Sequence, residues 1–437
     1  MTLASNHIAD RLAPPWRAVL LVGAGMIGAG VPLLVSSQST EAVLLALGLV
    51  LALAACAARL RERTALLPAL AEALRRPLGL ALVVMFLAWL PAVALSSSPM
   101  DSLPVWGRMV GLVLAAALIA GTLARSAEAR IIAAKTLLVG ALACGALALV
   151  GMHGGSAFYA LFKGRPFAAF DAGQFLKYYA SVVPCLMPVV LFAGFRLGGA
   201  WRHAALVYPP MALAIVLSLD SGAGLLGLIA AAAVGVLVWL AGAARLRLPA
   251  LGLLALIVGL GLAGLGYLFA TAPAPPPAEA IVDQRYDGPI ETPLPTALVD
   301  AHRQQIWGFS LDAAMERPWF GHGLDRSNYV PGAQDVIARF NQAFVPAHPH
   351  NWIIEVIVDA GFVGLAALLV ALGAFAARWF RIAREDRLLG AAGLGLAAAF
   401  FASSLLNFSF WLTWWQTVLL VLSALLLAFA PARPRVS

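Results

Sequence analysis

Long apolar runs constrain this chain more than any other feature. Of its 437 residues, 62% are hydrophobic and only 11% are charged, whereas soluble globular proteins carry about 25% charged residues. A helix of about 20 apolar residues crosses the ~30 Å hydrocarbon core of a bilayer and satisfies its own backbone hydrogen bonds. We therefore exclude an ordinary soluble protein and predict an all-α polytopic membrane protein with about twelve transmembrane helices, give or take one. The spans are expected near 18–36, 42–58, 78–95, 105–124, 131–150, 174–195, 204–219, 222–243, 249–270, 352–377, 388–407 and 411–430.

The spans divide the chain into three parts. Residues 1–271 hold the first nine spans, residues 272–351 form one large polar loop, and residues 352–437 hold the last three spans with a short tail. The first span has basic residues before it but no small-x-small cleavage site followed by a soluble domain, so we expect an uncleaved anchor.

The polar loop is expected to be folded and partly helical. We predict a helix from Thr296 to Arg317, because Thr296 can cap it and Pro318 stops it. A turn should follow at 318–323, and a second short helix is expected near Gln334–Phe344.

The distribution of Lys and Arg predicts the orientation, because basic loops stay on the cytoplasmic side during insertion. If the N-terminus is cytoplasmic, twenty of the 29 Lys and Arg residues fall on that side. The polar loop then faces the periplasm, and both termini are cytoplasmic. The net charge of +8 is explained by this topology, so no nucleic-acid partner is needed.

The remaining nine basic residues lie at the outer ends of spans or in the polar loop. Arg108 begins the fourth span and Lys177 lies inside the sixth, where an unpaired charge is costly and is usually retained for function. Arg165 lies in a short outer loop, and its guanidinium geometry suits a phosphate. Snorkelling to the interface is the alternative for Arg108.

Arg303 and Trp307 are four residues apart on the predicted loop helix and so share a face. An amphipathic helix on the membrane surface is one interpretation of this stripe. We favour a specific anion site at Arg303.

His348 and His350 flank Pro349, directly before the tenth span. Because proline extends the preceding residue, the two rings should point in different directions. Asn351 can cap the following helix, whose dipole would lower the pKa of His350, and a neutral imidazole can accept a proton. The loop has no cysteine and the chain has no Asp-x-Asp, so we expect no metal site and no cofactor. A histidine pair that merely fixes the helix start is the alternative.

Aromatic side chains cluster between the last two spans, at Phe408, Phe410, Trp411, Trp414 and Trp415. We interpret them as an interfacial aromatic belt, with sugar stacking as the alternative.

Three motifs together resemble those of the O-antigen ligase and polymerase superfamily. His350-Asn351, an apolar helix over 352–358 and Asp359-Ala360-Gly361-Phe362-Val363-Gly364 are similar to its His-Asn and acidic-small-Gly-x-x-Gly signature. Arg303 with Trp307 resembles its Arg-x-x-x-Trp helix, and the 318–323 segment resembles its Pro-x-x-Gly-x-Gly turn.

This resemblance implies transfer of a glycan from undecaprenyl pyrophosphate to an acceptor at the outer face of the bacterial inner membrane, without a metal or a nucleotide sugar. An acceptor hydroxyl needs a base and the pyrophosphate needs cations. We predict His350 as the base, with His348 as the alternative. The expected substrate-binding residues are Arg165, Arg303, Lys177, Arg108, His348 and Trp307. Backbone N–H groups of Gly321 and Gly323 could also meet phosphate, although a plain turn is favoured.

An O-antigen ligase that joins the glycan to a lipid A-core sugar is the first interpretation. O-antigen polymerase and protein O-oligosaccharyltransferase, from the same superfamily, are the alternatives. A polyprenyl-glycan transporter is the alternative from another class, although it predicts internal repeats and broken helices rather than a folded loop on one face. The expected partners are the lipid-linked donor, the lipid A-core acceptor and membrane lipids.

Overall fold

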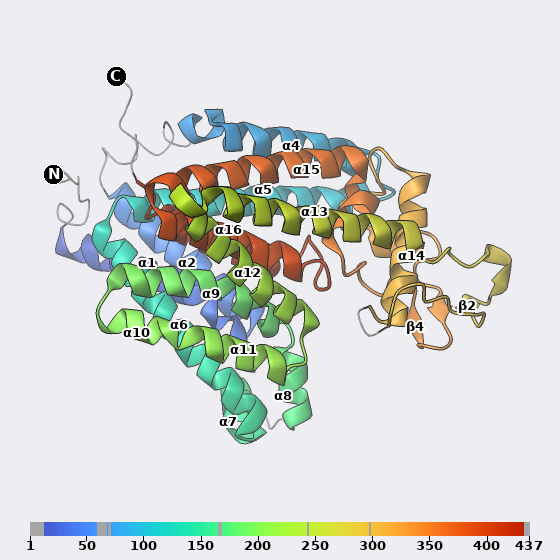
Figure 1. The fold of residues 1–437 in the computed structure, drawn as a ribbon, viewed down its shortest axis with the longest axis horizontal. Coiled ribbons are helices and arrows are strands. Elements are labelled where there is room, and N and C mark those ends of the chain that lie inside the picture. The colour runs from blue at the N-terminus through green and yellow to red at the C-terminus, as the bar shows by residue number, and fades with distance from the viewer. Residues whose placement is uncertain are drawn as a thin grey trace.

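The computed structural model describes residues 13–58, 68, 71–164, 168–242, 244–296 and 299–431. Long helices form a bundle, and the polar loop (residues 272–351) projects from one end of it (Figure 1). The long helices of the first part are α1 (Pro14–Gly30), α2 (Gln38–Ala57), α4 (Pro77–Ala94), α5 (Pro99–Ala124), α6 (Ala127–His153), α9 (Tyr179–Leu197), α12 (Gly222–Ala241) and α13 (Arg247–Thr271). After the loop come α15 (Trp352–Glu385), α16 (Arg387–Ser403) and α17 (Thr413–Leu427). Shorter helices are η2 (Pro32–Val35), α7 (Ser156–Lys163), α8 (Ala169–Leu176), α10 (Ala200–Leu206), α11 (Tyr208–Ser218) and η3 (Ala244–Leu246).

The prediction of an all-α polytopic membrane protein is confirmed. Within the described residues, nine helical segments are long and apolar enough to cross a membrane, with α10 and α11 counted together. The number twelve stays a prediction, because α1, α16 and α17 have 17, 17 and 15 residues and a span needs about 20.

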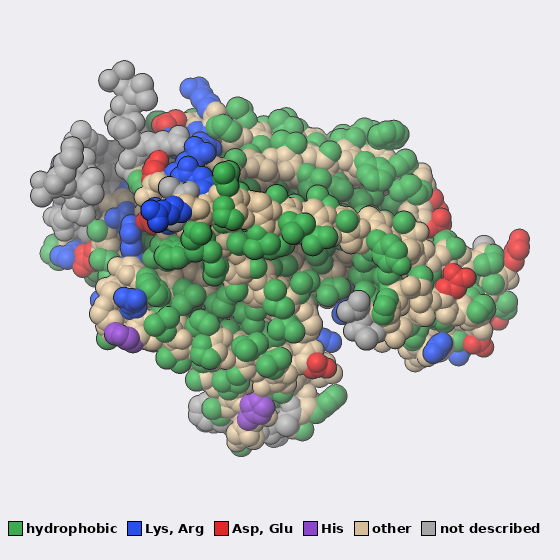
Figure 2. Space-filling view, in the orientation of Figure 1, with side chains coloured by type: hydrophobic (Ala, Val, Ile, Leu, Met, Phe, Trp, Pro, Cys, Tyr) green, Lys and Arg blue, Asp and Glu red, His purple; other side chains and the backbone are tan. Residues whose placement is uncertain are grey.

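Charge separates along the bundle. Figure 2 shows most of the visible Lys and Arg side chains at the end opposite the polar loop, and an apolar surface between the two ends. This is the pattern expected of a membrane protein whose basic end stays on one side. The cellular side of each end remains a prediction.

Two apolar cores hold the helices together. The larger core joins residues of α1, α6, α9, α16 and α17, and the smaller one joins α4, α5 and the middle of α15. Helix α9 is the most buried of the candidate spans. Side-chain caps fix several helix starts, as at Ser126, which accepts a hydrogen bond from the Ala129 N–H.

The polar loop contains a small sheet, which is an exception to the all-α prediction. Its strands are β1 (Ile281–Val282), β2 (Arg285–Tyr286), β3 (Val336–Ile337) and β4 (Gln342–Ala343), in that order. The outer pairs are antiparallel and β2 pairs with β3 in parallel, with Arg285 opposite Val336. Single 3-10 turns, η4 (Ala278–Ala280) and η5 (Ser327–Tyr329), complete the loop together with α14 (Ala301–Glu316).

Two helix predictions in this loop need correction. The helix expected near Gln334–Phe344 is wrong, because Asn341 adopts a left-handed conformation (φ 49°) and turns β3 back onto β4. The other helix starts at Ala301 rather than at Thr296. Asp300 caps it instead, since its carboxylate accepts from the Arg303 N–H at 2.9 Å.

The polar loop shares its apolar core with the membrane bundle. Ile306, Trp307 and Phe344 of the loop pack with Ile354 and Ile357 of α15. The start of α15 is thereby fixed against α14, and this junction positions the site.

Candidate active site

The start of α15 carries the two histidines. Asn351 caps the helix as predicted, with its side-chain oxygen accepting from the N–H groups of Ile353 (3.0 Å) and Ile354 (3.4 Å). The preceding residue, His350, is in the left-handed region at φ 57°. This conformation bends the chain so that the centres of the His348 and His350 rings lie 4.1 Å apart. The expectation that the rings point in different directions is therefore wrong.

Hydrogen bonds determine which nitrogen of each ring carries a proton. Nδ1 of His350 lies 3.0 Å from the carbonyl oxygen of Asn407, which can only accept, so Nδ1 of a neutral His350 holds the hydrogen. Its Nε2 then has a lone pair, and this atom makes no hydrogen bond with any described residue. Nδ1 of His348 accepts from the His350 N–H at 3.1 Å, so a neutral His348 carries its proton on Nε2.

Both imidazoles are held neutral. Burial lowers the pKa of His350 to about 4, helped by the positive charge of Arg303 and opposed by the bond to Asn407. Burial also lowers the pKa of His348 to about 3, helped by His350 and Arg303. The predicted direction is confirmed, but its leading cause is desolvation rather than a helix dipole.

Helix α14 brings Arg303 and Trp307 to the histidines. The Trp307 indole is buried, and its Nε1–H donates to the Pro349 carbonyl at 2.9 Å, which fixes the backbone between the two rings. Arg303 is partly exposed and pairs with Asp300, Nε to Oδ2, at 3.3 Å. We call Arg303, His348, His350 and Asn407 the histidine site.

Asn407 is a site residue that the sequence did not single out. Its side-chain amide donates to Ser181 of α9, so the carbonyl that orients His350 is itself fixed to the most buried helix of the bundle. No local sequence pattern predicts a contact between two residues that are 57 positions apart.

The Pro318–Gly323 turn is inserted into a break in α15. Gly361 has φ 68° and interrupts the helix. Around the break, the N–H of Phe362 donates to Pro318 (2.7 Å), and the N–H of His322 donates to Val358 (2.8 Å). A Cβ on Gly361 would overlap with the backbone of Trp319.

The glycine N–H groups of this turn are used within the protein. Gly321 N–H donates to Arg317 at 3.0 Å, and Gly323 N–H donates to the Asp359 carbonyl at 3.0 Å. The plain turn is therefore correct, and these groups are not free for phosphate.

Two fully buried carboxylates of α15 bind the surrounding loops. Glu355 accepts from Ser409 Oγ (2.5 Å) and from the Phe410 N–H (2.7 Å). Asp359 accepts from the Trp411 indole (2.6 Å) and the Arg326 N–H (3.1 Å). The spacing of two acids at i and i+4 inside an apolar helix was the signal that could have pointed to them.

Trp411 and Trp415 are fully buried, so the aromatic-belt interpretation is wrong for these two side chains. Trp411 instead joins Asp359 to α5, because its carbonyl accepts from Nη2 of Arg108 at 3.0 Å. Nε of Arg108 is buried and has no partner among the described residues.

The other predicted site residues lie apart from this cluster or are not described. Lys177 is exposed at the C-terminal end of α8, because the chain turns at 177–178 before α9 begins, so it does not lie inside a span. Arg165 lies outside the described residues. The structure thus brings together Arg303, Trp307, His348 and His350, and places Arg108 beside Trp411.

Fold and site define a polytopic membrane protein with a neutral histidine pair and an arginine at one end of its helix bundle. The family model described as O-antigen ligase matches residues 210–369. This segment runs from α11 into α15 and contains all four residues that the structure brings together, whereas Arg108, Arg165 and Lys177 precede it. The resemblance seen in the motifs is confirmed, because residues 210–369 match the model of the O-antigen ligase family.

Curated relatives match a smaller share of the chain than the family model does. A protein of Rickettsia conorii named "Putative polysaccharide ligase" is 25% identical over 118 residues, which are 26% of this chain and 28% of the relative. Its counterpart in Rickettsia prowazekii is 27% identical over 118 residues, which are 26% of this chain and 29% of that relative. The matched segments thus cover less than a third of these relatives.

Proposed function

We propose that this protein is an O-antigen ligase, which transfers a glycan from undecaprenyl pyrophosphate to a sugar hydroxyl of lipid A-core. The observation that carries this proposal is the unbonded Nε2 lone pair of His350, at a neutral ring that lies within the electrostatic reach of Arg303. An O-antigen ligase domain over residues 210–369 supports the reaction class.

The reaction is a single displacement with inversion. The acceptor hydroxyl oxygen attacks the anomeric carbon and gives its proton to Nε2 of His350. The bond from that carbon to the pyrophosphate oxygen breaks, and the lipid pyrophosphate leaves with the electron pair. Arg303 neutralises the developing charge, and Arg165, Lys177 and Arg108 are proposed as further cations for the donor. His348 donates from Nε2 to the substrate, and neither metal nor cofactor takes part.

The proposed location follows from the reaction and from the charge distribution. The protein lies in the bacterial inner membrane with both termini cytoplasmic, and the polar loop faces the periplasm, where the lipid-linked glycan and lipid A-core meet. The basic end of the bundle, opposite the loop, supports this orientation.

The decisive experiment is an in vitro reaction of the purified protein with lipid-linked glycan and three separate acceptors: rough lipopolysaccharide, a second lipid-linked glycan and a periplasmic protein. Product on rough lipopolysaccharide supports the ligase. Product only on the second or third acceptor would replace it with the polymerase or the protein glycosyltransferase. Lipid-linked glycan that crosses a vesicle membrane without any new bond would indicate a transporter.

His350→Ala tests the base in the same assay. We expect a loss of about 10²- to 10⁴-fold in rate, with the protein still inserted. His203→Ala is the matched control, because His203 is exposed on α10. Wild-type rates for His350→Ala would show that another group is the base.

A further inference from the structure

A polar cavity of about 500 Å³ lies at the start of α5 and is lined by groups that the proposed mechanism does not use. The start of α5 forms one wall, and two loop segments, 325–329 and 346–347, form the others. Ala347 belongs to this wall and is followed in the chain by His348. The volume falls within the range of about 300–1,000 Å³ that small-molecule sites occupy.

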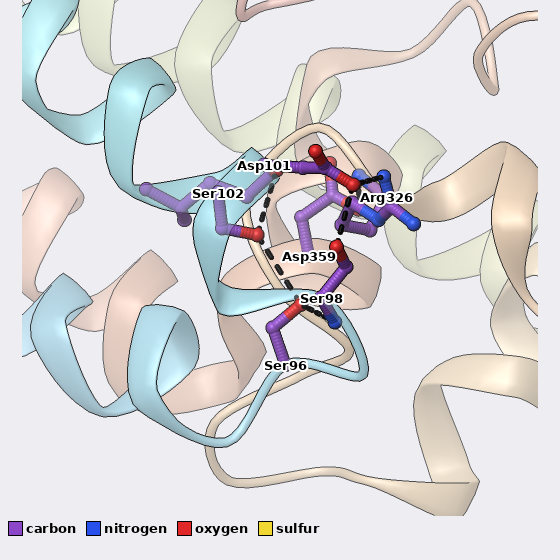
Figure 3. Close-up of polar contacts among 7 residues, drawn as sticks. Ser96, Ser98, Asp101, Ser102, Arg326 and Asp359 are labelled. Carbon is purple, nitrogen blue, oxygen red and sulfur yellow. Dashed lines mark hydrogen bonds and ion pairs between the residues drawn. The ribbon is translucent and has the colours of Figure 1, made fainter.

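Arg326 is fixed between two helices at this cavity. Its Nη1 pairs with Asp101 of α5 at 3.0 Å, and its main-chain N–H donates to Asp359 of α15 (Figure 3). Asp101 also accepts from Ser98 Oγ at 2.5 Å. Nε of Arg326 is buried and has no partner among the described residues. The side chain is therefore held rigidly, and its hydrogen-bonding capacity is not exhausted.

Asp325 and Asn328 present free polar groups. Neither the carboxylate of Asp325 nor the amide of Asn328 makes a side-chain hydrogen bond with any described residue, and both residues are partly exposed in the cavity wall. Asp325 is in the left-handed region at φ 60°. Burial raises the pKa of Asp325, and the charges of Arg108 and Arg326 oppose this. Aspartate tolerates this conformation, and a partly exposed carboxylate without a protein partner among the described residues is available to a ligand.

Tyr329 supplies an aromatic surface. The guanidinium carbon of Arg326 lies 3.9 Å from the centre of the Tyr329 ring, while the Tyr329 side chain remains 61% exposed. One face of the ring is thus covered by a cation, and much of the ring is open to a flat ligand.

We propose that this cavity is a subsite for an uncharged sugar residue of the transferred glycan or of the acceptor, bound by Asp325, Asn328 and Arg326. A sugar hydroxyl both donates and accepts, so a carboxylate beside an amide and a guanidinium matches neighbouring hydroxyls. Asp101 and Asp325 disfavour an anion here, which distinguishes this cavity from the site of the pyrophosphate. The inference rests on the proposed function, since it names which part of that substrate lies here.

Binding without turnover tests the subsite. Full-length protein in lipid nanodiscs is titrated with two water-soluble probes, the delipidated core oligosaccharide and the oligosaccharide released from the donor, and saturation-transfer NMR reports binding. We expect one probe to bind, and its identity names the source of the sugar. Asp325→Asn and Asn328→Ala should each weaken it by about tenfold. Asparagine tolerates the left-handed backbone of residue 325, so Asp325→Asn should fold.

Glu316→Gln is the matched control, because Glu316 is an exposed acid of α14 away from this cavity, and it should bind like wild type. Equal binding of the probe by wild type, Asp325→Asn and Asn328→Ala would overturn the subsite. Displacement of the bound oligosaccharide by inorganic pyrophosphate would also overturn it. If wild type binds neither probe, the subsite is also overturned.

The two proposals fail separately. If the wild type transfers glycan and the Asp325 and Asn328 variants bind the oligosaccharide with full affinity, the ligase proposal stands and the subsite proposal fails. If the wild type binds an oligosaccharide that these variants do not bind, but transfers glycan to no acceptor, the subsite proposal stands and the ligase proposal fails.

Discussion

The main-chain N–H of His350 donates to Nδ1 of His348 at 3.1 Å, and this bond gives the two rings opposite roles. His348 is left with a donor at Nε2, and His350, held by Asn407, is left with an acceptor. A hydroxyl placed between them could be oriented by one ring and deprotonated by the other. The left-handed backbone of His350 makes this pairing possible.

The first prediction concerns pH. Because the pKa of His350 is lowered to about 4, the ring stays neutral and able to accept a proton throughout the range above about pH 5. We expect kcat/KM to be flat from pH 6 to 8 and to fall only as the pH approaches 4. An acid limb near the ordinary histidine value of about 6.5 would contradict the buried, neutral ring.

Arg303→Gln should move this acid limb. Arg303 is the second cause of the lowered pKa, after burial, so its removal should raise the pKa of His350 and shift the limb to higher pH. The same variant should raise the KM for the lipid-linked donor by about tenfold or more, since a charge-assisted contact to phosphate is lost. Arg339→Gln is the control, an arginine of the same loop that is exposed beyond β3. An unchanged KM and pH profile would remove Arg303 from the site.

Trp307→Phe should separate the role of Trp307 in positioning the histidines from its role in the stability of the core. The variant keeps an aromatic ring in the core but loses the hydrogen bond to Pro349, which costs about 1 kcal/mol of stability. We expect a lower kcat with a small loss of Tm, because the backbone between the histidines is released. Trp319→Phe serves as the comparison, since Trp319 is 66% exposed. Equal kcat values for both variants would show that the Pro349 contact does not position the rings.

Gly361→Ala should destabilise the protein by about 1–3 kcal/mol, because a side chain is strained at φ 68° and its Cβ would overlap with Trp319. Gly373→Ala, in the same helix with open space around it, should be neutral or slightly stabilising. Thermal unfolding in detergent measures both. A Gly361→Ala protein as stable as Gly373→Ala would mean that the turn does not depend on the break.

Hydropathy and local rules predicted much of this structure. Apolar runs identified the helices of the bundle, and the short-range preference of asparagine predicted the Asn351 cap. The features that were predicted wrongly depend on contacts between residues that are distant in sequence. Val336 and Ile337 form a strand because β2, about 50 residues earlier, offers them backbone partners. The backbone conformation of His350 could not be predicted either, since no local sequence pattern indicates a left-handed histidine.

Part of the site could be predicted and part could not. Arg303, Trp307 and His350 could be found because motif spacing places them on one helix face and at one helix start. Asn407 and Arg326 depend on how the 404–411 connection and the 318–329 segment fold around α15, which no periodicity describes. Glu355 and Asp359 were visible in the sequence as paired acids in an apolar helix, and only their partners were missing.

The shared core of the polar loop and α15 has a practical consequence for experiments on fragments of this protein. Ile354 and Ile357 complete the apolar core around Trp307 and Phe344. A fragment of residues 272–351 alone would therefore expose part of this apolar core to water. Structural and binding work on the extramembrane portion therefore needs the first turns of the helix that follows it.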